Sequence, residues 1–142
     1  MINDNFALTG ALTVAVNDVV VQEVHNLVVA AGKEWVADRM ADANTVMTHM
    51  AIGAGTVPAA AGDTALGNES SRNTLTTSGG VVTANVIEYA CTWVPGVGTG
   101  AITEAGILDA GTAGDMLART VFPVVNKGVA DSMTITWSIT VS

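Results

Sequence analysis

Residues 134–141 read Thr-Ile-Thr-Trp-Ser-Ile-Thr-Val, and apolar side chains alternate with hydroxyl side chains along the whole stretch. Successive side chains of a β-strand point to opposite faces of the sheet, so the apolar residues share one face. Antiparallel strands that pack one face on a core carry this pattern. The stretch therefore predicts a half-buried antiparallel strand.

The beginning of the chain, about residues 6–29, carries two further strand-like runs on either side of Asn17 and Asp18. Asn and Asp tolerate the left-handed backbone of a tight two-residue turn, so the pattern predicts a long hairpin. Such a turn places Val16 opposite Val19 and sets the pairing of the rest of both arms.

Continuing that pairing along the hairpin places Glu23 opposite Leu12 and His25 opposite Gly10. These two pairs interrupt an otherwise apolar face, which we expect to meet solvent or a polar partner there. The opposite face carries the small side chains of residues 7–15 at alternate positions. That second face suits packing against another sheet or a neighbouring subunit.

The rest of the chain predicts one helix and further strands. Residues 30–43 change to helical spacing and indicate a helix over about 32–42. About eight strands in all, joined mostly by short connections, predict one all-β domain over residues 1–142, an antiparallel β-sandwich or a jelly-roll-like barrel. The expected β core of about 45–142 has a long loop at 53–67 and strands at 45–52, 72–77, 81–93, 101–108, 116–124 and 134–141.

Composition excludes several classes of partner. The 142 residues include 5 basic and 13 acidic side chains, a formal net charge of −8. Binding to nucleic-acid phosphates needs clustered Lys and Arg, so we expect no nucleic-acid partner. No run approaches the roughly 18 consecutive apolar residues of a membrane-spanning helix, and no signal peptide is visible. The sparsely charged surface suits packing against another protein.

The residues that most often carry catalysis are few and scattered. His25 and His49 lie in predicted strands, and neither has a second ligand at the spacing of a zinc site. Cys91 is the single cysteine, and its strand position is typical of a small buried hydrophobic residue. We therefore expect no catalytic, cofactor-binding or metal-binding residues, and a protein that is not an enzyme.

Three weaker patterns have simpler readings. The Gly-rich residues 96–100 lack the Lys-Ser/Thr ending of a phosphate-binding loop and indicate a flexible turn. Residues 68–70 match a glycosylation site, which we interpret as chance in a chain without a secretion signal. Asp63 and Glu69 offer oxygen ligands for calcium, although loop carboxylates are usually solvated. Asp63 is also placed to cap a short helical turn after it.

Two segments stand apart by their glycine pattern. Residues 50–56 read Met-Ala-Ile-Gly-Ala-Gly-Thr and lead to Gly-Asp-Thr-Ala-Leu-Gly-Asn-Glu at 62–69 and to Arg72. Residues 98–108 read Gly-Thr-Gly-Ala-Ile-Thr-Glu-Ala-Gly-Ile-Leu, followed by Met-Leu-Ala-Arg-Thr-Val-Phe at 116–122. Together with 127–141 they resemble small structural proteins of tailed bacteriophages, both stand-alone virion proteins and tail-fibre-associated modules. The resemblance covers about residues 50–141.

The resemblance implies a structural protein of the virion that is assembled in the host cytoplasm. The first expectation is a capsid decoration (cement) protein that binds the outer surface of the major capsid protein as a homotrimer and stabilises the head. Its long hairpin would reach across the junction between capsid subunits. The alternative is a tail or tail-fibre component that contacts a receptor. A third class, an enzyme such as a cell-wall hydrolase, needs a constellation of residues that the sequence does not show.

The charged residues of the resembling segments suggest a structural role. Arg72, Glu104 and Arg119 lie on or beside predicted strands in a chain with only five cations. We expect Glu104 to pair with one of these two arginines near an edge of the sheet. Breaking a buried pair of this kind costs on the order of 3–5 kcal/mol.

Overall fold

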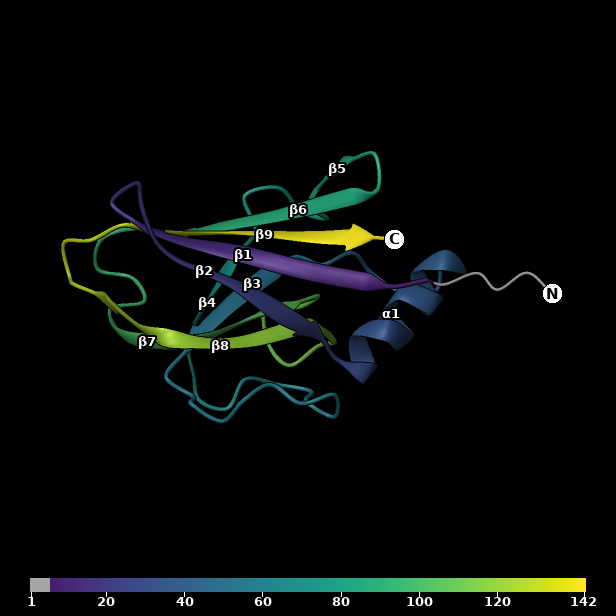
Figure 1. Cartoon of the computed structure of the whole chain (residues 1–142), viewed down its shortest axis with the longest axis horizontal. Coiled ribbons are helices and arrows are strands. Elements are labelled where there is room, and N and C mark those ends of the chain that lie inside the picture. The colour runs from purple at the N-terminus through teal and green to yellow at the C-terminus, as the bar shows by residue number, and fades with distance from the viewer. Residues whose placement is uncertain (1–5) are drawn as a thin grey trace.

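The computed structural model describes residues 6–142. These residues contain nine strands and one helix (Figure 1). All paired strands are antiparallel, which confirms the expected all-β class with one short helix. The elements are β1 (Leu8–Val16), β2 (Val19–Val28), α1 (Ala30–Met40), β3 (His49–Gly53), β4 (Glu69–Thr74), β5 (Val81–Thr83), β6 (Val86–Trp93), β7 (Gly100–Leu108), β8 (Met116–Lys127) and β9 (Met133–Val141).

The strands form one curled sheet in the order β4-β3-β7-β8-β2-β1-β9-β6-β5. Strand β2 is the corner of this sheet. It pairs with β1 from Val19 to Asn26 and with β8 only at Leu27 and Val28. The curl brings the end of β4 beside β6, where the N–H of Thr76 donates to the carbonyl of Ala90. In Figure 1 the layer of β6, β9 and β1 therefore lies over the layer of β7 and β8.

The structure confirms the half-buried strand that was predicted at 134–141, which is part of β9. Ile135, Trp137 and Ile139 are buried, whereas the Thr and Ser residues between them are half-buried. β9 lies in the interior of the sheet, between β1 and β6. The hairpin at the N-terminus and the strand at the C-terminus are thus direct neighbours in one sheet.

The hairpin turn is as predicted, but the register of its arms is not. Asn17 and Asp18 have φ values of 51° and 66°, the left-handed backbone of a two-residue turn. The pairing then shifts by one residue between Val14 and Ala15, so Leu12 lies opposite Val24 and not opposite Glu23. This irregularity is a β-bulge.

The bulge exchanges the two faces of β2, because a shift of one residue turns every later side chain to the other face. Val24 and Val28 face the core, while Glu23, His25 and Leu27 are exposed. Gly10 pairs with Asn26 and not with His25. Glu23 and His25 therefore do not interrupt the inner face. Its polar residues are instead Gln22 opposite Val14 and Asn26 opposite Gly10.

The segments around β4 and β5 also differ from expectation. The predicted strand 81–93 is divided into β5 and β6 by a tight turn at Ala84 and Asn85, where Ala84 has a φ of 53°. Strand β4 pairs with β3, and β5 pairs with β6 at the far edge of the sheet, so the turn near Gly79 does not form a β4–β5 hairpin. The predicted strand 45–52 is reduced to β3.

Helix α1 covers one end of the sheet. Its Trp35 is buried, and the indole N–H donates to the carbonyl of Thr45 over 2.8 Å. No helix in residues 6–142 has the length and apolar character needed to cross a membrane. The main core cluster lies inside the curl and includes Tyr89, Cys91 and Trp93. Most aromatic side chains are buried as expected, but Phe6 is 65% exposed.

Two glycines in the turn between β6 and β7 allow the packing of this turn to be tested. Gly96 and Gly98 both have positive φ, at 83° and 66°. A Cβ at Gly96 meets nothing, whereas a Cβ at Gly98 lies 2.8 Å from Trp93. We expect Gly96→Ala to lower the free energy of unfolding by about 1–2 kcal/mol, and Gly98→Ala by roughly 2–4 kcal/mol. Urea denaturation measures both, and equal losses would contradict the packing of this turn.

Candidate functional site

A buried ion pair lies in the middle of the sheet, between β7 and β8. Glu104 is 0% exposed and Arg119 is 2% exposed. Oε2 of Glu104 accepts hydrogen bonds from Nε of Arg119 over 3.1 Å and from Nη2 over 2.9 Å. The expected pairing of Glu104 with an arginine is confirmed. Its expected position near an edge is wrong, and Arg72 is paired with Glu69 instead.

Glu104 also fixes the two ends of the long loop 54–68. The backbone N–H groups of Gly55, Gly67 and Asn68 donate to its carboxylate over 2.9, 2.9 and 2.7 Å. Five donors in all satisfy the two oxygens. A carboxylate removed from water needs such partners, because its desolvation is costly.

Arg119 binds the middle of the same loop. Nη1 donates to Oδ2 of Asp63 over 2.9 Å, and Nη2 donates to the carbonyl of Val57 over 3.0 Å. Asp63 also accepts the N–H of Ala60, which closes a turn that comes before Asp63. The helical turn expected after Asp63 is not formed. The loop is therefore attached to the sheet at both ends and in the middle.

The ionisation of this cluster follows its hydrogen bonds. Burial raises the pKa of Glu104, but the three backbone donors and the Arg119 guanidinium outweigh it, so the pKa lies below its ordinary value. The hydrogen bond from Ala60, together with Arg119, lowers the pKa of Asp63. The cluster thus stabilises the charged forms of both carboxylates.

The other residues considered from the sequence are not brought together. The calcium pair is divided, because Asp63 binds Arg119 while Glu69 binds Arg72. Within residues 6–142 no group of three or more His, Cys, Asp or Glu side chains is arranged to hold a metal ion. His25 is exposed on β2, and Nδ1 of His49 lies 2.7 Å from the hydroxyl of Thr48.

Cys91 is completely buried in the core, as its strand position predicted. Burial raises the pKa of its thiol to about 12. A thiol of this kind stays protonated and is a poor nucleophile. The glycosylation pattern at 68–70 begins at Asn68, whose backbone N–H is bound by Glu104.

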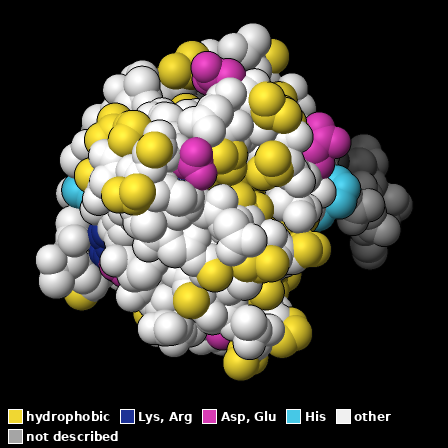
Figure 2. Space-filling model, turned by 90° about the vertical axis from the view of Figure 1, so that its left-hand side faces the viewer, with side chains coloured by type: hydrophobic (Ala, Val, Ile, Leu, Met, Phe, Trp, Pro, Cys, Tyr) yellow, Lys and Arg dark blue, Asp and Glu magenta, His cyan; other side chains and the backbone are white. Residues whose placement is uncertain are grey.

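A surface feature that the sequence did not single out lies at the end of the sheet opposite α1. Figure 2 views this end, where hydrophobic side chains spread over the surface and few charged ones lie between them. We call it the valine face. It comprises the exposed residues Val19, Val20, Val21, Val94, Val97, Val124 and Val129.

Backbone contacts hold the segments of the valine face together. The N–H of Gly96 donates to the carbonyl of Val129, and the N–H of Asn17 donates to Ser132. Val21 and Val124 line a shallow cavity of about 210 Å³ where β2 and β8 separate. The Val-Val-Val run at 19–21 signalled an apolar strand in the sequence, but only the bulge and the curl show that it is exposed.

The charges at the valine face are acidic. Asp18 is exposed at the hairpin tip, and Asp131 accepts a hydrogen bond from the Asn17 amide over 2.9 Å. That bond is the main cause of the lowered pKa of Asp131. The nearby Lys127 is buried and donates to the carbonyl of Val94. The face therefore offers apolar side chains and negative charge to a partner.

Comparison with protein-family models, with curated proteins and with solved structures found no match to this chain.

Removing one member of the buried pair leaves the other charge uncompensated. We expect Glu104→Gln and Arg119→Met each to lower the free energy of unfolding by about 3–5 kcal/mol, measured by thermal and urea denaturation. Asp42→Asn is the matched control, because it removes an exposed ion pair with Arg39 and is expected to cost less than about 0.5 kcal/mol. Losses under about 0.5 kcal/mol for both core variants would contradict the role of the pair.

The lowered pKa values of Glu104 and Asp63 predict loss of stability in acid. Each carboxylate binds protons more weakly in the folded than in the unfolded chain, so its stabilisation is complete above the ordinary values of 4.5 and 3.8. The stabilisation is lost as the pH falls through the lower folded values. Urea denaturation at a series of pH values is expected to give a shallower acid slope for Glu104→Gln. An unchanged slope would contradict this prediction.

Proposed function

We propose that this protein is a non-enzymatic structural protein of a tailed-bacteriophage virion. Its most concrete form is a capsid decoration protein that binds the outer surface of the major capsid protein and stabilises the head. The proposal rests on the sequence resemblance together with the valine face. The valine face carries the argument for a protein partner.

The segments that resemble phage proteins meet at the buried ion pair. Gly55, Asp63 and Gly67 come from residues 50–69, Glu104 from 98–108 and Arg119 from 116–122. Gly55 and Gly67 bind Glu104, Asp63 binds Arg119, and Glu104 binds Arg119. The residues that carry the resemblance thus form one structural unit. This arrangement supports a role of these residues in the fold and not in chemistry.

The valine face supports docking on another protein. Contiguous apolar surface is uncommon on soluble monomers and typically marks an interaction site. β-Branched side chains such as valine lose little conformational freedom when they are buried, because few rotamers are open to them. The acidic side chains at this face favour a partner surface that carries basic residues.

The hairpin contributes to this face through its tip and not as an extended arm. β1 is paired with β9 along its whole length, and β2 is paired with β1 and then with β8. Residues 8–28 are therefore part of the sheet, and the hairpin does not form a separate arm. In the proposal, residues 16–21 at the tip contact the capsid surface together with the neighbouring turns.

Copy number tests the place of the protein in the virion. A decoration protein is expected on the order of hundreds of copies per particle, as the symmetry of a capsid surface requires. Quantitative mass spectrometry of purified particles measures this number. A handful of copies in multiples of three or six would contradict the capsid role and favour the tail alternative. Analytical ultracentrifugation tests the proposed homotrimer, which a clean monomer at micromolar concentration would oppose.

Single lysines placed on the valine face test the docking surface. Val20→Lys and Val129→Lys put a charge where the bound state excludes water, so we expect occupancy on stripped capsids to fall at least about tenfold. Val82→Lys is the matched control, since Val82 is a 68% exposed valine on β5, away from this face. All three variants are expected to keep the wild-type melting temperature. Equal binding by all of them would contradict the proposed surface.

A further inference from the structure

A second candidate surface lies at the other end of the sheet, between the start of β1 and helix α1. β1 and β2 separate there, because their pairing begins only at Gly10 and Asn26 while β2 turns toward β8. Two adjoining cavities of about 460 and 370 Å³ fill the opening, and both are lined by Leu8 and Lys33. We call this opening the β1–β2 cleft.

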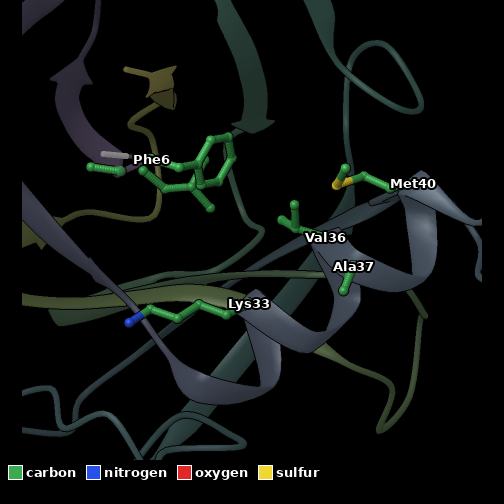
Figure 3. A pocket seen from close by; sticks show the side chains of 7 residues that line it. Phe6, Lys33, Val36, Ala37 and Met40 are labelled. Carbon is green, nitrogen blue, oxygen red and sulfur yellow. The ribbon is translucent and has the colours of Figure 1, made fainter. Parts of the chain in front are cut away.

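One wall of the cleft is apolar. Figure 3 shows Val36 and Met40 projecting from α1 toward Phe6. Met40 is 83% exposed and Phe6 is 65% exposed, which is unusual for side chains of this size. The wall is able to bury apolar side chains of a bound molecule.

The backbone of Leu8 is an unused strand edge. Ala7 and Ser142 exchange both hydrogen bonds, so the N–H and C=O of Leu8 point away from β9, because the pattern alternates along an antiparallel pair. On that other side no strand of residues 6–142 is paired with Leu8. Exposed edges of this kind bind extended peptides by adding a strand.

Lys33 gives the cleft its charge. Among residues 6–142 the other four cations have internal partners: Arg39 with Asp42, Arg72 with Glu69, Arg119 with Glu104, and Lys127 with the carbonyl of Val94. The structure shows no hydrogen bond or ion pair of the Lys33 side chain within the same residues, and this side chain runs from α1 toward the strands (Figure 3). Within the described part of the chain, its ammonium is therefore the cation that is open to a carboxylate.

Asn26 adds an unmet donor on the floor of the cleft. Its Oδ1 accepts the indole N–H of Trp137 over 2.9 Å, but its Nδ2 is buried without an acceptor. A buried donor without a partner is destabilising, and an acceptor on a bound molecule would satisfy it. Asn26 lines the same cavity as Leu8 and Lys33. Donors and an apolar wall therefore converge on one opening.

We propose that the β1–β2 cleft binds an extended segment of a partner protein that carries an acidic side chain between apolar ones. The segment pairs with the edge of β1 at Leu8, its carboxylate binds Lys33, and its apolar side chains pack on Phe6, Val36 and Met40. This site is separate from the valine face, and the inference does not depend on the phage assignment.

A library of short random peptides displayed on beads provides the probe. Selection on the wild-type protein is expected to enrich peptides with Asp or Glu between β-branched or aromatic residues. Lys33→Gln is expected to weaken the selected peptides at least about tenfold. Thr99→Asp, which changes the net charge equally at the opposite end of the sheet, is the control and is expected to bind like the wild type.

Amide NMR of the labelled protein locates the binding. The best peptide is expected to shift the signals of Leu8, Lys33 and the Asn26 side chain in a saturable manner. Enrichment without acidic residues, equal binding to Lys33→Gln, or shifts confined to other surfaces would each overturn the proposal. The NMR experiment uses only the wild-type protein. It therefore tests the site whether or not the Lys33→Gln variant folds.

Discussion

The buried ion pair of Glu104 and Arg119 is the interaction on which the position of the long loop 54–68 depends. Two charges taken out of water in the middle of a sheet are tolerated only when their remaining donors and acceptors are satisfied. The loop 54–68 supplies those partners from its backbone and from Asp63. Gly55 is required by this approach, because a Cβ at this position would lie 2.5 Å from Oε1 of Glu104.

The second constraint is the change of partner along β2. A sheet that closes around a core needs a strand that belongs to both of its layers, and β2 pairs first with β1 and then with β8. Where it leaves each partner the sheet opens. One opening places Val21 near Val124 on the valine face, and the other forms the β1–β2 cleft. Both proposed interaction surfaces are therefore consequences of the same curl.

Local patterns predicted the parts of the fold that local physics determines. The alternation of β9, the turn at Asn17 and Asp18, and the burial of Cys91 each depend on a few neighbouring residues. The bulge near Ala15 was not predictable from the two arms alone, because which face of β2 meets the core also depends on its pairing with β8, some 90 residues along the chain. The pairing of Glu104 was predicted from the scarcity of cations, whereas its loop partners depend on backbone groups that no side-chain pattern reveals.

The distribution of charge bears on how copies of this protein meet. With a net charge of −8 and most cations paired internally, identical surfaces repel one another at low ionic strength. In a symmetric trimer built through the valine face, Asp18 and Asp131 would lie near their own counterparts. That face is thus better suited to a different, more basic protein.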